Sequence, residues 1–290
     1  MRSVAPALRD TAPGRMSAEG GRPPVMNIVV CMKQVPDTYS ERKLRPDSTL
    51  DRDAADAVIN ELDEYAIEEG LRLVEAHGGE VTILSMGPEK ASESIRKALS
   101  MGADKAVHLV DDALHGSDAL ATSAALAAVL GRIGFDLVIL GSESTDARMG
   151  VMAAMLAERL GVPQLSFASK VDIDGTAISI NRQADYGYDR VQASLPAVVS
   201  VVEKINEPRY PSFKGIMAAK KKPVETLSLA DIGIDPGQSA WPGRPPRWSA
   251  SPAARPGRPG RSSRTKATAA PRPPSSSPRR SSSEPGGLNT

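Results

Sequence analysis

Apolar and polar positions follow one another along this chain in blocks that predict strands and helices in turn. Four apolar runs have the continuous character of strands buried on both faces, and they span residues 26–32, 80–86, 105–110 and 135–141. Helical spacing is present in residues 53–77, 89–101 and about 117–130. In the first of these helices Ile59, Leu62, Ala66 and Leu73 share one face. Strands that alternate with helices predict a doubly wound parallel sheet of the α/β class.

The pattern changes after Leu165, where shorter strands with turn residues between them replace the alternation of strand and helix. Asp174 and Gly175 form a typical hairpin turn. The predicted strands of this part are residues 170–174, 176–183, 190–195 and 197–202. They predict a small antiparallel β extension of the main sheet.

The two ends of the chain differ from this body in composition. Residues 1–25 are rich in Arg, Pro, Gly and Ala and are predicted to be a disordered extension. We favour a translation start at Met26 over a transit peptide. Residues 236–290 consist largely of Pro, Arg and Ser and cannot bury enough apolar surface to fold. This tail is either a functional basic arm or, as we hypothesise, the product of a frameshift near Gln238, which resequencing the DNA would test. The predicted domain is therefore 26–235.

Charge is unevenly distributed between the body and the ends. The whole chain has 36 Lys and Arg against 35 Asp and Glu, whereas residues 26–235 contain 22 basic and 32 acidic residues, a net charge of −10. An acidic body argues against nucleic acid as a partner, because phosphate binding requires a basic face. No apolar run approaches the roughly 20 residues that span a bilayer. The single cysteine, Cys31, excludes an internal disulfide and suits a reducing cytoplasm. The three histidines are scattered, so no metal site is predicted.

The loop of residues 141–150 (GSESTDARMG) is the best candidate for ligand binding, because ligands of doubly wound sheets bind beyond the carboxyl ends of the strands. It has glycine at each end, hydroxyl groups at Ser142, Ser144 and Thr145, and a helix start after it. The N-terminus of a helix can hold a phosphate. On spacing alone we favour the plainer alternative, in which Thr145 or Asp146 caps the helix.

The residues indicate no catalytic site. Ser144, His108 and Asp146 could be assembled into a triad, but no nucleophile-elbow motif accompanies them. Cys31 lies in an apolar strand and is more typical of a buried small hydrophobe than of a nucleophile. Four acidic residues on the first predicted helix are interpreted as a solvated face, and they are Asp63, Glu64, Glu68 and Glu69.

Residues 206–222 (NEPRYPSFKGIMAAKKK) combine an apolar tip with basic residues. The lysines alone would fit a nuclear signal, a nucleic-acid patch or a solvated helix end. Aromatic, Met and Arg residues on a projecting loop are instead typical of transient protein interfaces. We therefore predict that a partner protein docks on Arg209, Tyr210, Phe213, Ile216, Met217, Lys220, Lys221 and Lys222.

Several stretches taken together resemble the β subunit of electron transfer flavoprotein. They are VVCMKQVPDT (29–38), IRKALSMGADKAVHLVDD (95–112), DLVILGSESTD (136–146) and LPAVVSVVEKINEPRYPSFKGIMAAKKK (195–222). The likeness covers about 27–235 in the family's order, with few changes of length. Each motif alone is moderately specific, and their succession is specific.

The resemblance implies an adenine-nucleotide-binding α/β domain in an electron carrier subunit that is not an enzyme. It implies a heterodimer with an α subunit that holds most of the FAD site, while the β subunit holds a structural AMP. Such a complex carries electrons from acyl-CoA and related dehydrogenases, as in fatty acid β-oxidation, to a membrane quinone oxidoreductase. The expected location is the bacterial cytoplasm, or the mitochondrial matrix if residues 1–25 are a transit peptide. Direct membrane insertion is not expected.

The resemblance also implies the positions of the binding residues. The AMP contacts carried over by position are Cys31, Asn60, Glu61, Leu62, Asp63, Met86, Gly141, Ser142, Glu143, Ser144, Thr145, Asp146, Ala147, Arg148, Met149, Gly150, Val151 and Met152. Thr38 and Tyr39 fall where the family's β subunit approaches the flavin, and Phe213 aligns with the apolar anchor of its recognition loop.

The chain departs from the family pattern in three places. It lacks the Asn-Gln pair often found around 150–151, which would weaken AMP binding if those side chains hold the phosphate. Tyr186 and Arg190 replace residues that are commonly acidic or small. The C-terminal segment that helps to join β to α is missing or out of frame, which puts stable heterodimer formation in doubt. Two other functions stay open: an electron-bifurcating form with FAD in the AMP site, and a stress-type nucleotide-binding regulatory domain that would not need 206–222.

Overall fold

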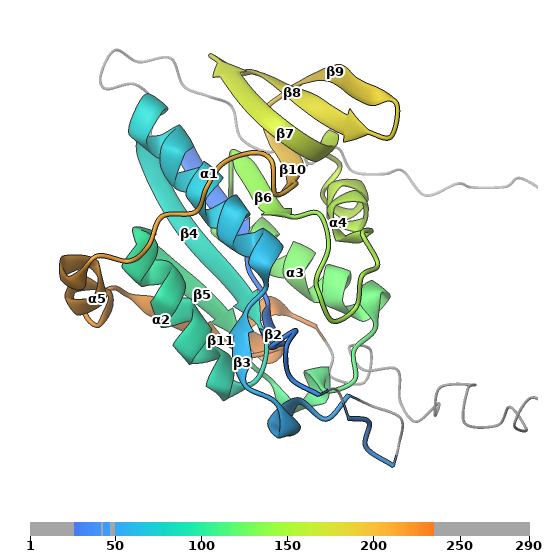
Figure 1. Ribbon diagram of the computed structural model, residues 1–290, viewed down its shortest axis with the longest axis vertical. Coiled ribbons are helices and arrows are strands. Elements are labelled where there is room, and N and C mark those ends of the chain that lie inside the picture. The colour runs from blue at the N-terminus through green and yellow to red at the C-terminus, as the bar shows by residue number, and fades with distance from the viewer. Residues whose placement is uncertain (1–25, 42, 47–49, 235–290) are drawn as a thin grey trace, which may run out of the picture. The chain divides into compact units, whose positions relative to one another are not determined.

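The computed structural model describes residues 26–41, 43–46 and 50–234, which form a nine-stranded sheet with helices on both faces (Figure 1). In spatial order the strands are β11 (Val224–Leu227), β5 (Lys105–Leu109), β4 (Gly79–Met86), β1 (Met26–Cys31), β6 (Leu137–Gly141), β10 (Ala197–Val201), β7 (Gln164–Asp174), β8 (Ala177–Ala184) and β9 (Gly187–Ser194). Pairing is parallel from β11 through to β7 and antiparallel from β7 to β9. The predicted extensions 1–25 and 236–290 lie outside the described residues, as does the last position of the predicted domain.

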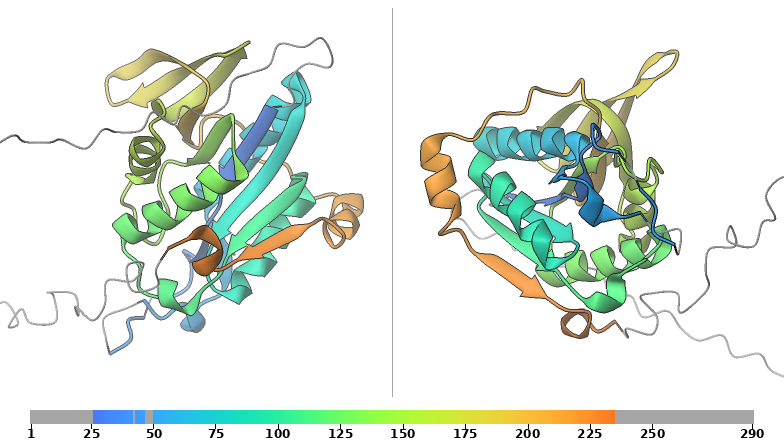
Figure 2. Two further views of the ribbon diagram at one scale, coloured as in Figure 1. Left: turned by 180° about the vertical axis from the view of Figure 1, so that it is seen from behind. Right: turned by 60° about the horizontal axis from the view of Figure 1, so that its bottom comes forward.

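The helices divide between the two faces of the sheet (Figure 2). One face is covered by α1 (Glu61–His77) and α2 (Ser92–Met101), and the other by α3 (Ala119–Ile133) and α4 (Met152–Leu160). Alternate residues of each strand supply the two cores, because successive side chains of a strand point to opposite faces. In β1, Ile28 and Val30 pack on the α1 side and Val29 packs on the α3 side. The predicted α/β class with a doubly wound sheet is confirmed.

The helix predicted over 53–77 is shorter than expected. Only α1 is α-helical, and a short 3-10 helix (Arg52–Ala54) and β3 (Ala57–Ile59) precede it. Strand β3 pairs antiparallel with β2 (Gln34–Pro36) in a separate small sheet. The β-branched pair Val58 and Ile59 favours strand, and the apolar residue Ile59 satisfied the helical spacing although it lies in the strand.

Strand β10 corrects the predicted antiparallel addition. Residues 197–202 were expected in the extension, but β10 lies between β6 and β7 in the main sheet and is parallel to both. All five of its residues are buried, as a strand covered on both faces requires. Its largely apolar sequence, AVVSV, is typical of a strand that is covered on both faces.

The remaining expectations for the extension are confirmed. Strands β7, β8 and β9 form two successive hairpins. The first turn contains Gly175, whose φ of 59° lies in the left-handed region that favours glycine. The extension therefore continues the main sheet by antiparallel pairing.

After β10 the chain leaves the sheet and crosses α1 to reach a short helix, α5 (Phe213–Ala219), before it returns as the edge strand β11 (Figures 1 and 2). We call residues 202–212 the strap. Neither α5 nor β11 was predicted from the sequence. A seven-residue helix gives too few turns for a helical period, and a four-residue edge strand has little apolar content.

Candidate nucleotide site and docking helix

Three segments that are distant in the sequence meet at the carboxyl ends of β1 and β6. They are the turn that follows β1, the start of α1, and the loop of residues 142–151 between β6 and α4. We call this last segment the nucleotide loop. This edge of a parallel sheet is where doubly wound proteins bind their ligands, so the geometry places the predicted loop at the expected position.

Asp63 ties the three segments together. Its carboxylate accepts hydrogen bonds from the backbone N–H of Lys33 at 2.8 Å and from that of Gly141 at 3.1 Å. Burial raises the pKa of Asp63 to about 7, although hydrogen bonds from Lys33, Asn60 and Gly141 act in the opposite direction. A side chain in the first turn of α1 thus fixes the ends of two neighbouring strands.

The prediction of a solvated acidic face on α1 is wrong for most of its members. Three of the four residues are buried, and they are Asp63, Glu68 and Glu69. Glu68 accepts from Arg209, and Glu69 accepts from Asn206. Only Glu64 keeps part of its surface in solvent. The sequence of α1 alone does not reveal the strap, whose Arg209 and Asn206 bind Glu68 and Glu69.

Asn60 holds the nucleotide loop against α1. Its side chain is fully buried, donates to the carbonyl oxygen of Glu143 at 3.0 Å, and accepts from the backbone N–H of Thr145 at 3.0 Å. Asn60 occupies the N-cap position of α1 but makes no side-chain capping hydrogen bond. Its amide therefore fixes a remote loop rather than its own helix.

Asp146 anchors the same loop through charge. Its carboxylate contacts Lys33 Nζ at 2.8 Å and an Arg52 terminal nitrogen at 2.6 Å, and its side chain is 3% exposed. Burial alone would raise the pKa of Asp146, but hydrogen bonds and charge from Lys33, with further hydrogen bonds from Arg52 and Ser144, hold it well below its usual range. Asp146 does not cap a helix, because α4 begins only at Met152, so the plainer alternative from the sequence is wrong.

Gly141 has to be glycine for α1 to pack against the end of β6. A Cβ atom at this position would lie 2.7 Å from the Asp63 Oδ1 and 2.7 Å from the Leu62 Cβ. Contacts this short do not occur between real side chains, so one of the two elements would have to move. Close packing at Gly141 is what allows the Asp63 carboxylate to reach the backbone N–H of this residue.

The start of α4 leaves its backbone donors available. Val151 occupies the N-cap position with no side-chain capping hydrogen bond, and the first N–H groups of a helix have no partner within the helix. Arg148 and Gly150 before it adopt left-handed backbone conformations, with φ of 49° and 64°. A helix N-terminus attracts anions through these N–H groups and the helix dipole.

Comparison with known proteins identifies this combination of fold and loop. The family model named electron transfer flavoprotein domain matches residues 47–232. The electron transfer flavoprotein subunit beta of Mycobacterium bovis is 59% identical over 216 residues, which are 72% of this chain and 81% of that protein. The proteins of the same name from Mycobacterium leprae (58% over 216 residues, 72% and 81%) and Thermoanaerobacterium thermosaccharolyticum (38% over 221 residues, 76% and 85%) are also similar.

The chain belongs to the electron transfer flavoprotein beta-subunit family. The resemblance drawn from the sequence is thereby confirmed, and the chain is an electron carrier subunit rather than an enzyme. Membership of this family excludes the stress-type regulatory domain that was left open as an alternative.

Two of the cofactor positions implied by this family line the strand ends. Cys31 is buried at the end of β1, and burial, followed by the charge of Asp63, raises the pKa of its thiol to about 12. Met86, at the end of β4, is half-buried against the core on the α3 side. A thiol this far from ionisation is a small neutral group, in agreement with the interpretation of Cys31 as a buried hydrophobe rather than a nucleophile.

The positions of the family's nucleotide loop range from half-buried to exposed. Residues 142–146 are half-buried, and the segment from Ala147 to Val151 is exposed. The Ser142 N–H donates to the carbonyl of Val201 at 2.9 Å and so attaches the loop to β10. At the start of α1, Glu61 is exposed and Leu62 is half-buried. The loop therefore has a fixed base and an accessible rim.

Thr38 and Tyr39, which the sequence resemblance predicts to approach a flavin, lie in the turn that follows β2. Both are exposed, and Tyr39 is 95% exposed, with its backbone N–H bonded to the Asp37 carboxylate. Their exposure is what a position facing another subunit would show in the isolated chain.

Two residues of the site were missed by the sequence reasoning. Lys33 lies in the turn after β1, at the carboxyl end of a parallel strand, and a residue at this position is a candidate for ligand binding. Arg52 lies in a polar segment far from the loop, and nothing in its neighbourhood indicated a contact with Asp146.

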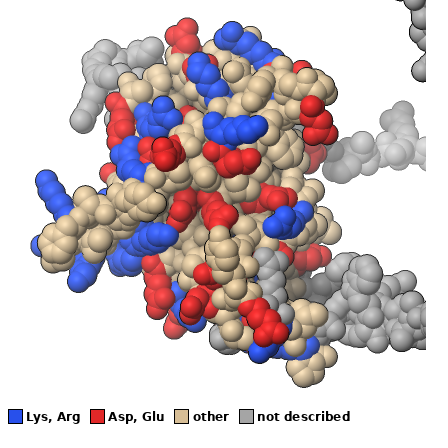
Figure 3. Space-filling model, in the orientation of Figure 1, with Lys and Arg blue, Asp and Glu red and all other residues tan. Residues whose placement is uncertain are grey.

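The predicted docking residues divide into an exposed and a structural set. Phe213 is 80% exposed, and Tyr210, Ile216 and Met217 also expose much of their surface. Figure 3 shows this apolar surface projecting at the left with Lys and Arg side chains around it. Arg209 is instead held against α1 by two glutamates. The apolar tip predicted from the sequence is therefore presented to solvent by α5.

The lysine run is also divided. Lys220 and Lys221 are exposed, but the ammonium of Lys222 donates to three backbone carbonyls at the end of α2, those of Leu99, Gly102 and Ala103. The ammonium group of Lys222 is therefore already engaged within the domain.

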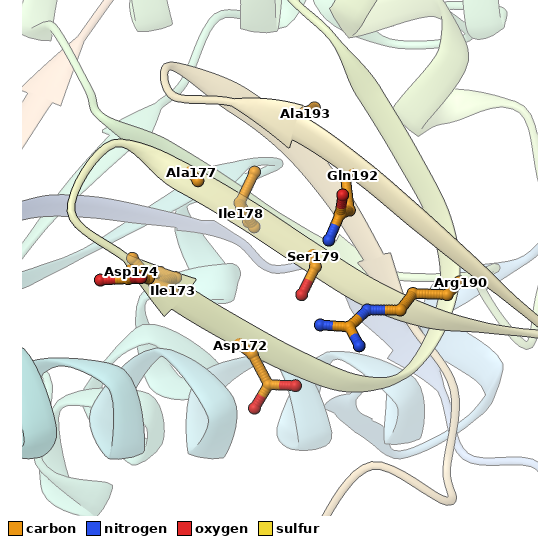
Figure 4. Close-up of a pocket in the computed structure, with 9 residues that line it drawn as sticks. All are labelled: Asp172, Ile173, Asp174, Ala177, Ile178, Ser179, Arg190, Gln192 and Ala193. Atoms are coloured by element: carbon orange, nitrogen blue, oxygen red, sulfur yellow. The ribbon is translucent and has the colours of Figure 1, made fainter.

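A shallow pocket lies on the antiparallel extension (Figure 4). Asp172, Ser179 and Gln192 form a row across β7, β8 and β9, and Arg190 lies beside it. Asp172 is paired with Lys170 at 2.8 Å. This pocket contains none of the nucleotide-loop residues, and its strand-face side chains do not form an acid–base pair.

Within the described residues, no group of His, Cys, Asp and Glu side chains has an arrangement that could hold a metal ion. Among the same residues, no helix has both the length and the apolar character needed to cross a membrane.

Proposed function

We propose that this chain is the AMP-binding subunit of a heterodimer that carries electrons from acyl-CoA and related dehydrogenases to a membrane quinone oxidoreductase. The partner implied by the name of its relatives, subunit beta, is an alpha subunit that holds most of the FAD. FAD supplies the redox chemistry when bound. This chain binds AMP, contributes Thr38 and Tyr39 near the flavin, and docks the dehydrogenase. The complex acts in the cytoplasm of a bacterium.

The start of α4 is the observation that carries the AMP proposal. Its first backbone N–H groups follow the exposed segment 147–151, and the N-cap residue Val151 makes no side-chain capping hydrogen bond. A phosphate is the ligand that such a helix start favours. Gly150, Val151 and Met152 would hold the phosphate by their backbone, which does not require the Asn-Gln pair that many family members have there.

Two acidic residues of the site, Asp63 and Asp146, do not oppose an anion. Asp146 is neutralised by Lys33 and Arg52, and Asp63 turns both of its oxygens toward backbone donors. A paired carboxylate repels a nearby phosphate far less than a free one would. The adenosine part would contact the strand ends at Cys31 and Met86 and the start of α1.

The docking part of the proposal rests on α5. Phe213, Ile216 and Met217 form an exposed apolar surface, with Lys214, Lys220 and Lys221 around it. Apolar anchors within a charged rim are characteristic of specific but transient protein contacts. We propose that a dehydrogenase places an apolar pocket with an acidic rim over this surface.

The experiment is to co-express the chain with its alpha subunit, purify the complex, denature it and quantify the nucleotides released. One AMP and one FAD per heterodimer are expected. Two FAD without AMP would support the electron-bifurcating form instead. Failure of the two chains to co-purify would contradict the heterodimer.

A matched pair of variants tests the phosphate position. Val151→Asp and Val151→Asn both supply a capping side chain to α4, but only the first adds a negative charge. If a phosphate binds at the start of α4, Val151→Asp should lower the AMP content at least tenfold and clearly more than Val151→Asn does. Equal AMP content in the two variants would show that the phosphate lies elsewhere.

A further inference from the structure

The docking helix α5 is too short to keep its position without external support. It has seven residues, and isolated helices shorter than about 12 residues are marginal in water. Its own N-terminal cap is one hydrogen bond, from the Gly215 N–H to the Ser212 hydroxyl at 3.0 Å. Three of its side chains point to solvent, and they are Phe213, Ile216 and Met217. The other contacts of α5 and its flanks must therefore fix its direction.

Gly215 provides the first attachment. A Cβ atom at this position would lie 2.4 Å from the carbonyl oxygen of Ser100, near the end of α2. This distance is far below van der Waals contact, so any side chain at 215 would push α5 away from α2. Ala219, at the end of α5, is 3% exposed. Small residues on one side of α5 thus bring its backbone close to the domain.

Arg209 provides the second attachment, from the strap before α5. Its guanidinium donates to Glu68 at 2.7 and 3.0 Å and to Glu75 at 2.6 and 3.1 Å, and its backbone N–H also donates to Glu68. Bidentate pairs of this kind fix orientation as well as distance. Asn206 adds bonds to the Tyr65 carbonyl and to Glu69. The strap is therefore fastened along α1.

Lys222 provides the third attachment, directly after α5. Its ammonium donates to the carbonyls of Leu99, Gly102 and Ala103 at 2.6–3.0 Å, which places a cation where the dipole of α2 favours one. In return, an Arg96 terminal nitrogen donates to the carbonyls of Ala219 and Lys222 at 2.7 and 2.9 Å. The segments before and after α5 are thus both hydrogen-bonded to helices of the domain.

We propose that Arg209, Gly215 and Lys222 are positioning residues for docking, which hold α5 in one orientation so that the partner meets a preorganised apolar anchor. This inference rests on the proposed docking function. Fixing the helix in advance removes the ordering cost that a loose segment would add to the encounter. The lysine run then has two roles, with Lys222 attaching α5 and Lys220 and Lys221 facing the partner.

The test uses the chain co-purified with its alpha subunit, together with a purified acyl-CoA dehydrogenase and its substrate. Gly215→Ala and Lys222→Met remove single attachments. Their matched controls are Gly131→Ala, on an exposed position of α3 where a Cβ meets nothing within 4 Å, and Lys90→Met, on an exposed position before α2. The readouts are amide hydrogen exchange in 213–219, the KM for the complex in the dehydrogenase reaction, and the content of AMP and FAD.

We expect Gly215→Ala and Lys222→Met to speed exchange in α5 and to raise KM about tenfold, since a loosened anchor must be ordered on binding. Gly131→Ala and Lys90→Met should change neither readout. AMP and FAD contents should stay unchanged in all four variants. A purely structural role would alter exchange without altering KM.

The outcomes separate this inference from the docking proposal on which it rests. If Phe213→Ala leaves KM unchanged, α5 is not the docking surface and the proposed function fails at this point. If Phe213→Ala raises KM but the two attachment variants do not, although exchange in α5 is faster, the positioning role is wrong. Unchanged exchange in both attachment variants would show that these contacts do not hold α5, which also overturns the inference.

Discussion

The nucleotide loop and the docking helix use charged and apolar residues in opposite ways. Around the nucleotide loop, the carboxylates of Asp63 and Asp146 are held by hydrogen bonds or ion pairs from neighbouring groups, and the backbone donors at the start of α4 have no capping side chain. In α5 the accessible groups are apolar side chains, and charges such as Arg209 and Lys222 hold the helix from behind. The difference follows from the ligand that is proposed for each region. A phosphate needs backbone donors without other partners, whereas a protein partner needs apolar area that the domain has left uncovered.

Of the replacements proposed, that of Gly141 should have the largest effect, and it acts on the nucleotide loop. Gly141→Ala forces its Cβ to within 2.7 Å of Asp63 Oδ1 and Leu62 Cβ, and overpacking of this kind costs roughly 1–3 kcal/mol of unfolding free energy. Because the Asp63 contact is displaced as well, we also expect the AMP content of the complex to fall sharply. Thermal unfolding and nucleotide analysis of the purified complex would check both expectations.

Gly131→Ala is the control for this replacement, because its Cβ meets nothing within 4 Å. In a helix interior the exchange of Gly for Ala stabilises by about 1 kcal/mol. If Gly141→Ala were as stable as this control and kept its AMP, α1 would not depend on the close approach to β6.

Truncation of Phe213 should affect the docking side without affecting the fold. The side chain is 80% exposed, so Phe213→Ala should leave thermal unfolding and AMP and FAD contents unchanged. Loss of an apolar anchor typically weakens an interface by about 1–2 kcal/mol, which corresponds to a slowing of about tenfold in electron transfer from a dehydrogenase below saturation. Stopped-flow reduction of the complex by an acyl-CoA dehydrogenase measures this rate. An unchanged rate would place the anchor elsewhere.

The pH dependence of stability tests the role of Asp63, which supports the base of the nucleotide loop. Burial raises the pKa of this carboxyl from 3.8 to about 7 in the folded chain. Its contribution to stability is therefore complete below pH about 4 and is lost as pH rises through about 7, because the folded state holds the proton more tightly than the unfolded state.

In Asp63→Asn this titration is absent, because an amide does not ionise. The unfolding free energy of the parent should therefore fall relative to that of the variant between pH 5 and pH 7.5, by up to about 1.4 kcal/mol per pH unit. Urea unfolding of the complex at several pH values provides the measurement. Parallel stability curves for the two proteins would mean that Asp63 does not titrate in this range.

The strands of the main sheet could be predicted from the sequence because a short, continuous apolar run bounded by turn residues is characteristic of a strand buried on both faces. The start of α1 could not, since Ile59 satisfies a helical period and also fits a β-branched strand. Strand β10 was misplaced because it follows two hairpins in the chain, and its sequence order concealed its parallel neighbours β6 and β7. The local sequence pattern thus identified strands more reliably than it predicted their neighbours in the sheet.

For the candidate site, residues on the loop itself could be identified, and the residues that hold it could not. The family resemblance supplied Asn60 and Asp63, but Lys33 and Arg52 reach Asp146 only through the fold, from positions 113 and 94 residues away. The same limitation misled the interpretation of Glu68 and Glu69, whose partners arrive on the strap. Pairing between remote charges leaves no periodic signal in a single sequence.

The charge separation of the domain has a consequence for how partners approach it. The body carries a net charge of −10, while the exposed Lys214, Lys220 and Lys221 lie in or directly after α5, and Figure 3 shows Lys and Arg side chains around the projection at the left. An acidic protein that diffuses toward this molecule is repelled over most of its surface and attracted at one projection. Successful collisions are thus selected by direction before any apolar contact forms, and a higher ionic strength should weaken this directional selection.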